Sequence, residues 1–163
     1  MKNLSQYKSG ILVAGFAGPH GDDRVGWSVV AALGSRPCVP ARLITVGEET
    51  QLIDEVEECN LLVAVDACRG GSRIGRISRL EWPDPRIRQY HNHSKYGIKL
   101  CNALQLMDRM GRMPEKVVVF GVDIGNRRPL GAPIAEVAQA VAELDQIIFS
   151  EICENIDARA VVG

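Results

Sequence analysis

The sequence lacks the features that mark several large classes of protein. Its 19 lysines and arginines nearly balance its 20 acidic residues, and the formal net charge of -1 gives no electrostatic basis for binding nucleic acid or an anionic membrane. No apolar run approaches the roughly 20 residues that span a bilayer, and residues 1–9 lack the apolar core of a signal peptide. We therefore expect a cytoplasmic protein.

The cysteines also lack the spacing that is typical of disulfide-bonded or zinc-binding proteins. The cysteines are odd in number and scattered, and no two form a C-x-x-C pair, which argues against both disulfides and a zinc knuckle. We expect reduced thiols at Cys38, Cys59, Cys68, Cys101 and Cys153.

What the sequence does contain is an alternation of strand-like and helix-like segments within 163 residues, of which 46% are hydrophobic. This length suits a single domain covering residues 1–163. Strands are predicted at Ile11–Phe16, Ala41–Val46, Asn60–Val65, Ile74–Leu80 and Lys116–Val122, the fourth near a sheet edge. Helices are predicted around Val25–Leu33, Leu52–Glu58, Leu100–Met107 and Pro133–Ile148, with a long irregular loop at Pro83–Lys95. The pattern predicts an α/β fold, a three-layer α/β/α domain with a twisted, mostly parallel sheet.

The first strand, loop and helix contain the most informative segment. Gly15, Gly18 and Gly21 do not fit G-x-G-x-x-G, and the Walker lysine is absent, so neither phosphate-binding fingerprint is met. Asp22 and Asp23 would repel a phosphate at the start of the following helix. Since ligands bind beyond the carboxyl ends of strands in open α/β sheets, this loop indicates a site for a cation or a cationic group.

Other polar residues are expected at the same edge of the sheet. Asp66 follows the buried third strand, Asp123 follows the last strand, and His91 and His93 lie in the predicted loop. Carboxylates and imidazoles gathered at one edge suit a borderline transition metal, and they equally suit an acid/base pair.

Each of these residues also has a structural interpretation. Asp22 fits a helix N-cap, and Asp23 fits a first-turn acid that favours the helix dipole. His20 is a weaker candidate, and lone loop histidines are most often solvated. Cys68 fits a small buried hydrophobe better than a soft ligand. Asp66 is harder to explain structurally, because an unpaired carboxylate leaving a buried strand is costly.

Taken together, these residues resemble the hydrogenase maturation endopeptidases, which remove a C-terminal extension from the large subunit of nickel-iron hydrogenases. The resemblance spans Ile11 to about Ile148. It rests on the motifs Asp22-Asp23-Arg-Val-Gly26, Val65-Asp66-Ala67, a histidine in a loop before a helix, and Val117–Val122 with Leu130-Gly-Ala-Pro133 before the last helix.

The resemblance implies a set of site residues and a partner. Asp23, Asp66 and His93 match the acid, acid and histidine that sense metal in the family. The metal is nickel already inserted in the hydrogenase large-subunit precursor, bound transiently, and the reaction is hydrolysis of a peptide bond placed by these contacts.

The sequence also departs from the family pattern. The first loop is one residue shorter before its acids, Gly47 stands where an acid is usual, and one additional residue separates His93 from Gly97. Two alternatives therefore stay open: a non-catalytic member that binds a metal-loaded precursor, and, resting only on the glycine-rich loop, a nucleotide-binding α/β module.

Overall fold

The computed structural model describes residues 10–16, 24–69, 73–91, 97–125 and 134–162. Five strands and five helices lie within these ranges. The strands are β1 (Ile11–Phe16), β2 (Arg42–Val46), β3 (Leu61–Cys68), β4 (Ile77–Glu81) and β5 (Lys116–Asp123). The helices are α1 (Val25–Gly34), α2 (Glu49–Glu55), α3 (Arg86–His91), α4 (Gly97–Arg109) and α5 (Ala135–Val162).

The five strands form one sheet in the order β2-β1-β3-β5-β4. β1 pairs in parallel with β2 and β3, β3 pairs in parallel with β5, and only the edge strand β4 runs antiparallel to its neighbour. The predicted α/β class with a mostly parallel sheet is confirmed. From β1 the chain passes through α1 to β2 on one side of the sheet, whereas from β3 it continues to β4 and β5 on the other side. The strand order therefore reverses between β1 and β3, and this is where α/β sheets form their ligand crevice.

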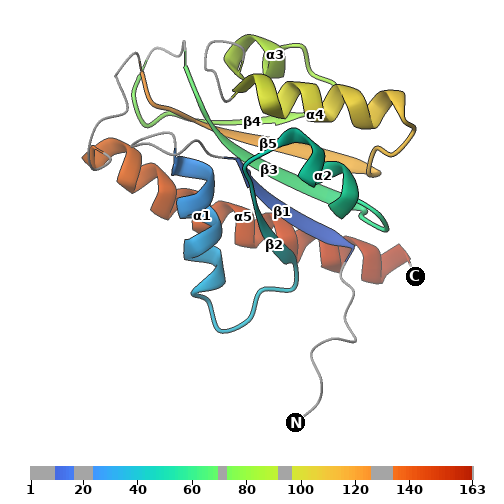
Figure 1. Ribbon diagram of the computed structural model, residues 1–163. Helices are drawn as coiled ribbons and strands as arrows, with labels where there is room; N and C mark the ends of the chain where they lie inside the picture. Colours follow the sequence, from blue (N-terminus) through green and yellow to red (C-terminus); the bar gives the residue numbers. More distant parts are fainter. Residues whose placement is uncertain (1–9, 17–23, 70–72, 92–96, 126–133, 163) are drawn as a thin grey trace.

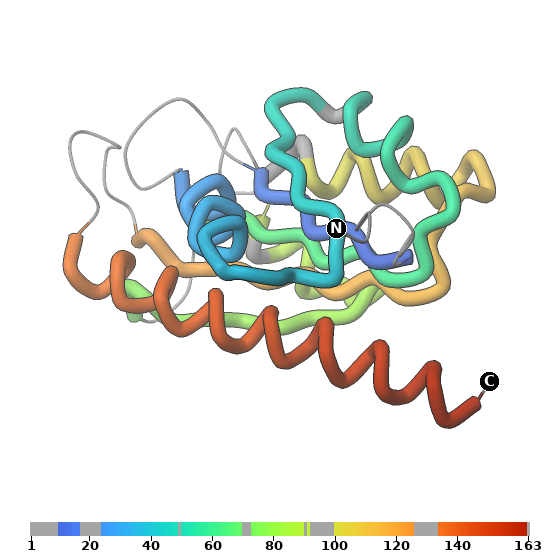
Figure 2. Tube along the Cα trace, turned by 90° about the horizontal axis from the view of Figure 1, so that it is seen from below, coloured from blue at the N-terminus to red at the C-terminus, as the bar shows by residue number. Residues whose placement is uncertain are grey.

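Helices cover both faces of the sheet, and a separate hydrophobic cluster fills each interface. Figure 1 shows α2, α3 and α4 on one side and α1 and α5 on the other, and Figure 2 shows α5 running the length of its face. Val63, Phe120 and Leu144 belong to the cluster under α1 and α5. Leu62, Val119 and Leu104 belong to the cluster under α2 and α4. Since adjacent residues of a strand face opposite ways, β3 and β5 are apolar on both sides.

Two glycines allow α1 to lie unusually close to the sheet. A Cβ on Gly15 would stand 2.2 Å from the carbonyl oxygen of Gly26, and a Cβ on Gly26 would stand 2.2 Å from the carbonyl oxygen of Phe16. The backbones of β1 and α1 are therefore in direct contact. At its other end α1 is fixed to α5, where Arg36 Nε and Nη2 donate to Asp145 at 3.0 and 2.8 Å.

Two predictions about the chain between β3 and α4 were wrong. The strand at residues 60–65 continues to Cys68, because β5 pairs with it in register as far as Cys68 opposite Asp123. The predicted loop at Pro83–Lys95 contains α3. The carboxylate of Asp84 accepts a hydrogen bond from the N–H of Arg86 at 2.9 Å, and Asp-Pro before a helix is a recognised start signal.

The remaining predicted elements agree with the structure to within a few residues, except that α5 extends beyond Ile148 to Val162. Gly111 has a φ of 65°, and the N–H of Arg112 donates to the carbonyl of Met107 at 2.9 Å, so the glycine ends α4. All five cysteines are free. Within the described ranges, no helix has the length and apolarity needed to cross a membrane.

Candidate functional site

A fully buried polar contact joins β3 to the end of α3. His91, the last residue of α3, places Nδ1 3.4 Å from Oδ2 of Asp66. Both side chains are buried, with 0% and 1% of their surfaces exposed. Asp66 faces α3 and α4 because it follows Leu62 and Ala64 on the same side of β3. β3 thus presents the carboxyl group of Asp66 to the imidazole of His91 in the interior of the protein.

Neither group is fully satisfied by the described residues around it. Apart from the 3.4 Å contact, no hydrogen bond from a described residue reaches Asp66 Oδ2 or either ring nitrogen of His91. Burial raises the pKa of the Asp66 carboxyl above its ordinary value, and the neighbouring His91 partly offsets this shift. A buried carboxyl with spare hydrogen-bonding capacity is the kind of group that functional sites retain at a cost to stability.

Gly121 of β5 provides the space beside this pair. It is the register partner of both Asp66 on β3 and Ser78 on β4. A Cβ at this position would lie 2.8 Å from Ser78 Oγ, 3.0 Å from Cys68 Sγ and 3.4 Å from His91 Cε1. Only a residue without a side chain leaves these three groups in place around one point.

Cys68 is next to the pair but has no thiolate character. Burial, followed by the charges of Asp123 and Asp66, raises the pKa of its thiol to about 12. The thiolate is the form that attacks carbonyls and binds metals, so this thiol is inert at neutral pH. These surroundings support the interpretation of Cys68 as a small buried hydrophobic side chain.

The structure brings together some of the predicted site residues. Asp66 and His91 are in contact, and Asp123 is the register partner of Cys68, two residues beyond Asp66 on the same face of β3. The predictions for His20, Asp22, Asp23 and His93 fall outside the described residues. Within the described part of the chain, no three His, Cys, Asp or Glu side chains are grouped so that they could hold a metal ion by themselves.

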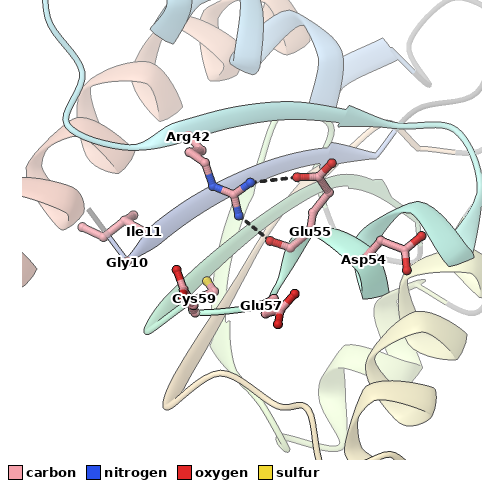
Figure 3. A pocket seen from close by; sticks show the side chains of 8 residues that line it. Gly10, Ile11, Arg42, Asp54, Glu55, Glu57 and Cys59 are labelled. Atoms are coloured by element: carbon pink, nitrogen blue, oxygen red, sulfur yellow. Dashed lines mark hydrogen bonds and ion pairs between the residues drawn. The ribbon is translucent and has the colours of Figure 1, made fainter. Parts of the chain in front are cut away.

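A separate pocket of about 410 Å³ lies at the opposite end of the sheet, near the start of β1. Figure 3 shows its wall, where Arg42 donates to the carboxylate of Glu55 at 2.8 Å and also to the Glu55 carbonyl. Burial raises the pKa of the Cys59 thiol in this wall, which removes it as a nucleophile. The Asp66–His91 pair therefore offers the better chemistry.

The pair can act in two ways. An ionised Asp66 and a neutral His91 can both donate electron pairs to a cation placed at the carboxyl end of β3. Alternatively, the imidazole can exchange a proton with a reacting group while the carboxylate fixes its orientation. Both uses require a further partner at the spare atoms of the pair.

Sequence reasoning missed two contributors to this site. Ser78 and Gly121 carry no distinctive local pattern, and only strand pairing shows that they adjoin Asp66. Ile87 and His91 are four residues apart, a spacing typical of one helix face, and both are buried, but this spacing alone does not indicate that His91 contacts Asp66.

Comparisons with known proteins bear on the family of the chain. The family model described as HycI, hydrogenase maturation protease, matches residues 43–151, a range that contains Asp66, His91 and His93 but not Asp23. No curated protein sequence matches the chain significantly.

Several solved structures have the same fold. The hydrogenase maturating endopeptidase HybD from E. coli is 19% identical with a TM-score of 0.75, and the match covers 89% of this chain and 93% of that one. An endopeptidase from Escherichia coli, solved in solution, is 20% identical with a TM-score of 0.77 and the same coverage. The [NiFe] hydrogenase maturation protease HybD from Thermococcus kodakarensis is 14% identical with a TM-score of 0.72, covering 87% and 98%. With more than half of its length matched by the family model, the chain belongs to the hydrogenase maturation protease family.

Proposed function

We propose that this protein is an endopeptidase that removes the C-terminal extension of a nickel-loaded [NiFe]-hydrogenase large-subunit precursor. Family membership supports the reaction class. The observation that carries the proposal within this chain is the buried Asp66 carboxyl, which faces His91 at the carboxyl end of the central strand and retains an unfilled oxygen.

In this proposal the metal belongs to the substrate. Asp23, Asp66 and His93 contact the nickel already inserted in the precursor, and these contacts place the scissile peptide bond for attack by water. Bringing the bond and the water together lowers the entropic part of the barrier, and a nearby cation polarises the carbonyl. His91 has a separate role, which is to hold the Asp66 carboxylate in its orientation.

The test uses the purified protein and the large-subunit precursor from the same organism, with and without inserted nickel. We expect intact-mass spectrometry to show loss of a C-terminal peptide only from the nickel-loaded precursor. Cleavage of both forms would contradict the role of nickel. Cleavage of neither form, with the precursor shown to be nickel-loaded, would contradict the peptidase proposal.

A non-catalytic role is the second candidate, and the start of α2 favours it. Gly47 stands where an acid is usual, its N–H donates to Gln51 Oε1 at 2.8 Å, and the following Glu48 is exposed at the helix N-cap. A protein of this kind would bind the nickel-loaded precursor without shortening it. Co-elution of the two proteins with unchanged precursor mass would establish this alternative.

His91→Gln tests the orienting role of the histidine. We expect processing to fall by about 10- to 100-fold, because losing a group that orients a ligand costs roughly this much. His93→Ala, which removes a proposed nickel contact, should reduce processing to the background rate. Equal, complete losses in both variants would show that His91 contacts the metal or substrate directly. The measurement is the initial rate on nickel-loaded precursor, with circular dichroism confirming that each variant is folded.

A further inference from the structure

A small pocket adjoins the Asp66–His91 pair on the same face of the sheet. It has a volume of about 200 Å³, and its wall includes Cys68 from β3, Arg76 just before β4, Ser78 from β4 and Asp123 from β5. Cys68 and Ser78 also surround Gly121, which lies against His91. The pocket and the pair are therefore neighbours across Gly121.

Asp123 in the pocket wall is buried, and one of its two carboxyl oxygens has no hydrogen bond from the described residues. It is 2% exposed, and its Oδ1 accepts a hydrogen bond from the N–H of Gly125 at 2.8 Å. Its own N–H donates to the carbonyl of Arg76 at 3.0 Å, and its carbonyl accepts from Gly75 at 2.7 Å. Oδ2 is buried and receives no hydrogen bond from any described residue.

The described arginines around the pocket do not supply the missing hydrogen bond to Asp123 Oδ2. Arg79 is bound to Glu151 at 2.6 Å and to Glu81 at 3.1 Å, and Arg86 is bound to Asp84 at 2.6 Å. Arg76 lines the same pocket and is exposed. No described arginine donates to Asp123 Oδ2.

The size and chemistry of the pocket define what it can accept. A volume of 200 Å³ is below the roughly 300–1,000 Å³ of pockets that hold whole small molecules, so the space suits a single side chain. An ionised carboxylate can only accept hydrogen bonds, so the missing partner must be a donor. A buried polar atom that stays unpaired is costly, and the gain on pairing it is correspondingly large.

We propose that this Asp123 pocket is a subsite that binds one hydrogen-bond-donating side chain of the substrate peptide, close to the bond that is cleaved. The proposal takes the identity of the ligand, a peptide, from the proposed function. It makes Asp123 a residue that determines specificity, and it leaves the reaction itself to the residues around Asp66.

The test compares the wild-type protein, Asp123→Asn and the matched control Asp108→Asn, an exposed acid on α4. Each is assayed on the nickel-loaded precursor and on precursors carrying single alanine substitutions around the cleaved bond. We expect Asp123→Asn to lower kcat/KM about tenfold, as for a lost hydrogen bond to a charged group, and Asp108→Asn to have no effect. For one of the alanine precursors, the wild-type protein should show the same, about tenfold lower kcat/KM. With that precursor, Asp123→Asn should cause no further decrease, because the side chain that Asp123 binds is already absent.

A second measurement separates this proposal from the proposed function. Calorimetry with synthetic peptides from the C-terminal region of the precursor, in the Asp66→Asn background, should show about tenfold weaker binding when Asp123→Asn is added. If the wild-type protein cleaves the precursor and Asp123→Asn gives wild-type values in both assays, the subsite is refuted and the peptidase proposal stands. If no cleavage occurs but Asp123→Asn still weakens peptide binding, the peptidase fails and the subsite stands.

Two further outcomes bear on the subsite. If Asp123→Asn lowers kcat/KM by the same factor on every alanine precursor, no single side chain binds in the pocket, and the proposal is overturned. If Asp123→Asn does not fold, as judged by its melting curve, Ser78→Ala takes its place in the same assays. Its hydroxyl lines the same pocket, so a selective loss supports the subsite and an unchanged profile overturns it.

Discussion

Asp66→Asn should abolish processing of the nickel-loaded precursor. The substitution keeps the size of the side chain but removes its negative charge, which is the property that a nickel contact and a proton transfer both need. We expect a loss of at least about a thousandfold, within the range for removing a group that acts directly in the reaction. The rate of C-terminal shortening, followed by intact-mass spectrometry, measures it.

The same variant should be more stable than the wild-type protein at neutral pH. Burial raises the pKa of Asp66 in the folded state above its ordinary value of 3.8, so the folded protein favours the uncharged carboxyl. The stability contributed by that uncharged form is complete below the ordinary pKa and is lost as the pH rises through the folded-state pKa. The wild-type protein and Asp66→Asn should thus have similar free energies of unfolding near pH 4. Toward pH 7, Asp66→Asn should become more stable than the wild type by on the order of 1 kcal/mol.

Two comparisons make this prediction specific. Asp157→Asn changes an exposed acid on α5 and should alter neither processing nor stability, as is usual for surface positions. Asp23→Asn should abolish processing as Asp66→Asn does. Normal processing by both site variants would show that the site is assigned to the wrong residues. A loss of stability in Asp66→Asn at pH 7 would show instead that attraction between Asp66 and His91 outweighs the cost of burial.

The parts of the fold that could be predicted from the sequence are those whose residues share one environment. β1, β3 and β5 are runs of apolar residues because helices cover both of their sides, so each strand is recognisable by itself. α3 is different, because it has six residues, and among those whose side chains the structure describes only Ile87 and His91 are buried. Short polar helices are formed by their neighbours, and their propensity alone does not reveal them.

The candidate site was predictable to the level of an edge of the sheet and no further. Asp66, Asp123 and the histidines were placed there because parallel strands end together. Which histidine contacts Asp66 depends on how α3 packs against β3, and the space at Gly121 depends on the pairing of β4 with β5. These are contacts between distant residues, and neither the residue type nor its local spacing encodes them.

Gly26→Ala should strongly destabilise the protein. The added Cβ would stand 2.2 Å from the carbonyl oxygen of Phe16 and 2.6 Å from that of Val65, which belong to two adjacent central strands. All of these atoms are backbone, so no side chain can move aside, and α1 must withdraw from the sheet. We expect a loss of about 3 kcal/mol or more, equivalent to a melting temperature lower by about 6 to 12 °C.

Gly34→Ala in the same helix provides the matched control, with an effect of opposite sign. Its Cβ would find only Leu43 Cδ1, at 3.8 Å, which is an ordinary contact. Alanine favours a helix over glycine, so stability should rise by up to about 1 kcal/mol. Thermal unfolding of both variants tests the close contact of α1 with β1 and β3. An unchanged melting temperature in Gly26→Ala would show that the backbone of α1 does not depend on this close approach to β1 and β3.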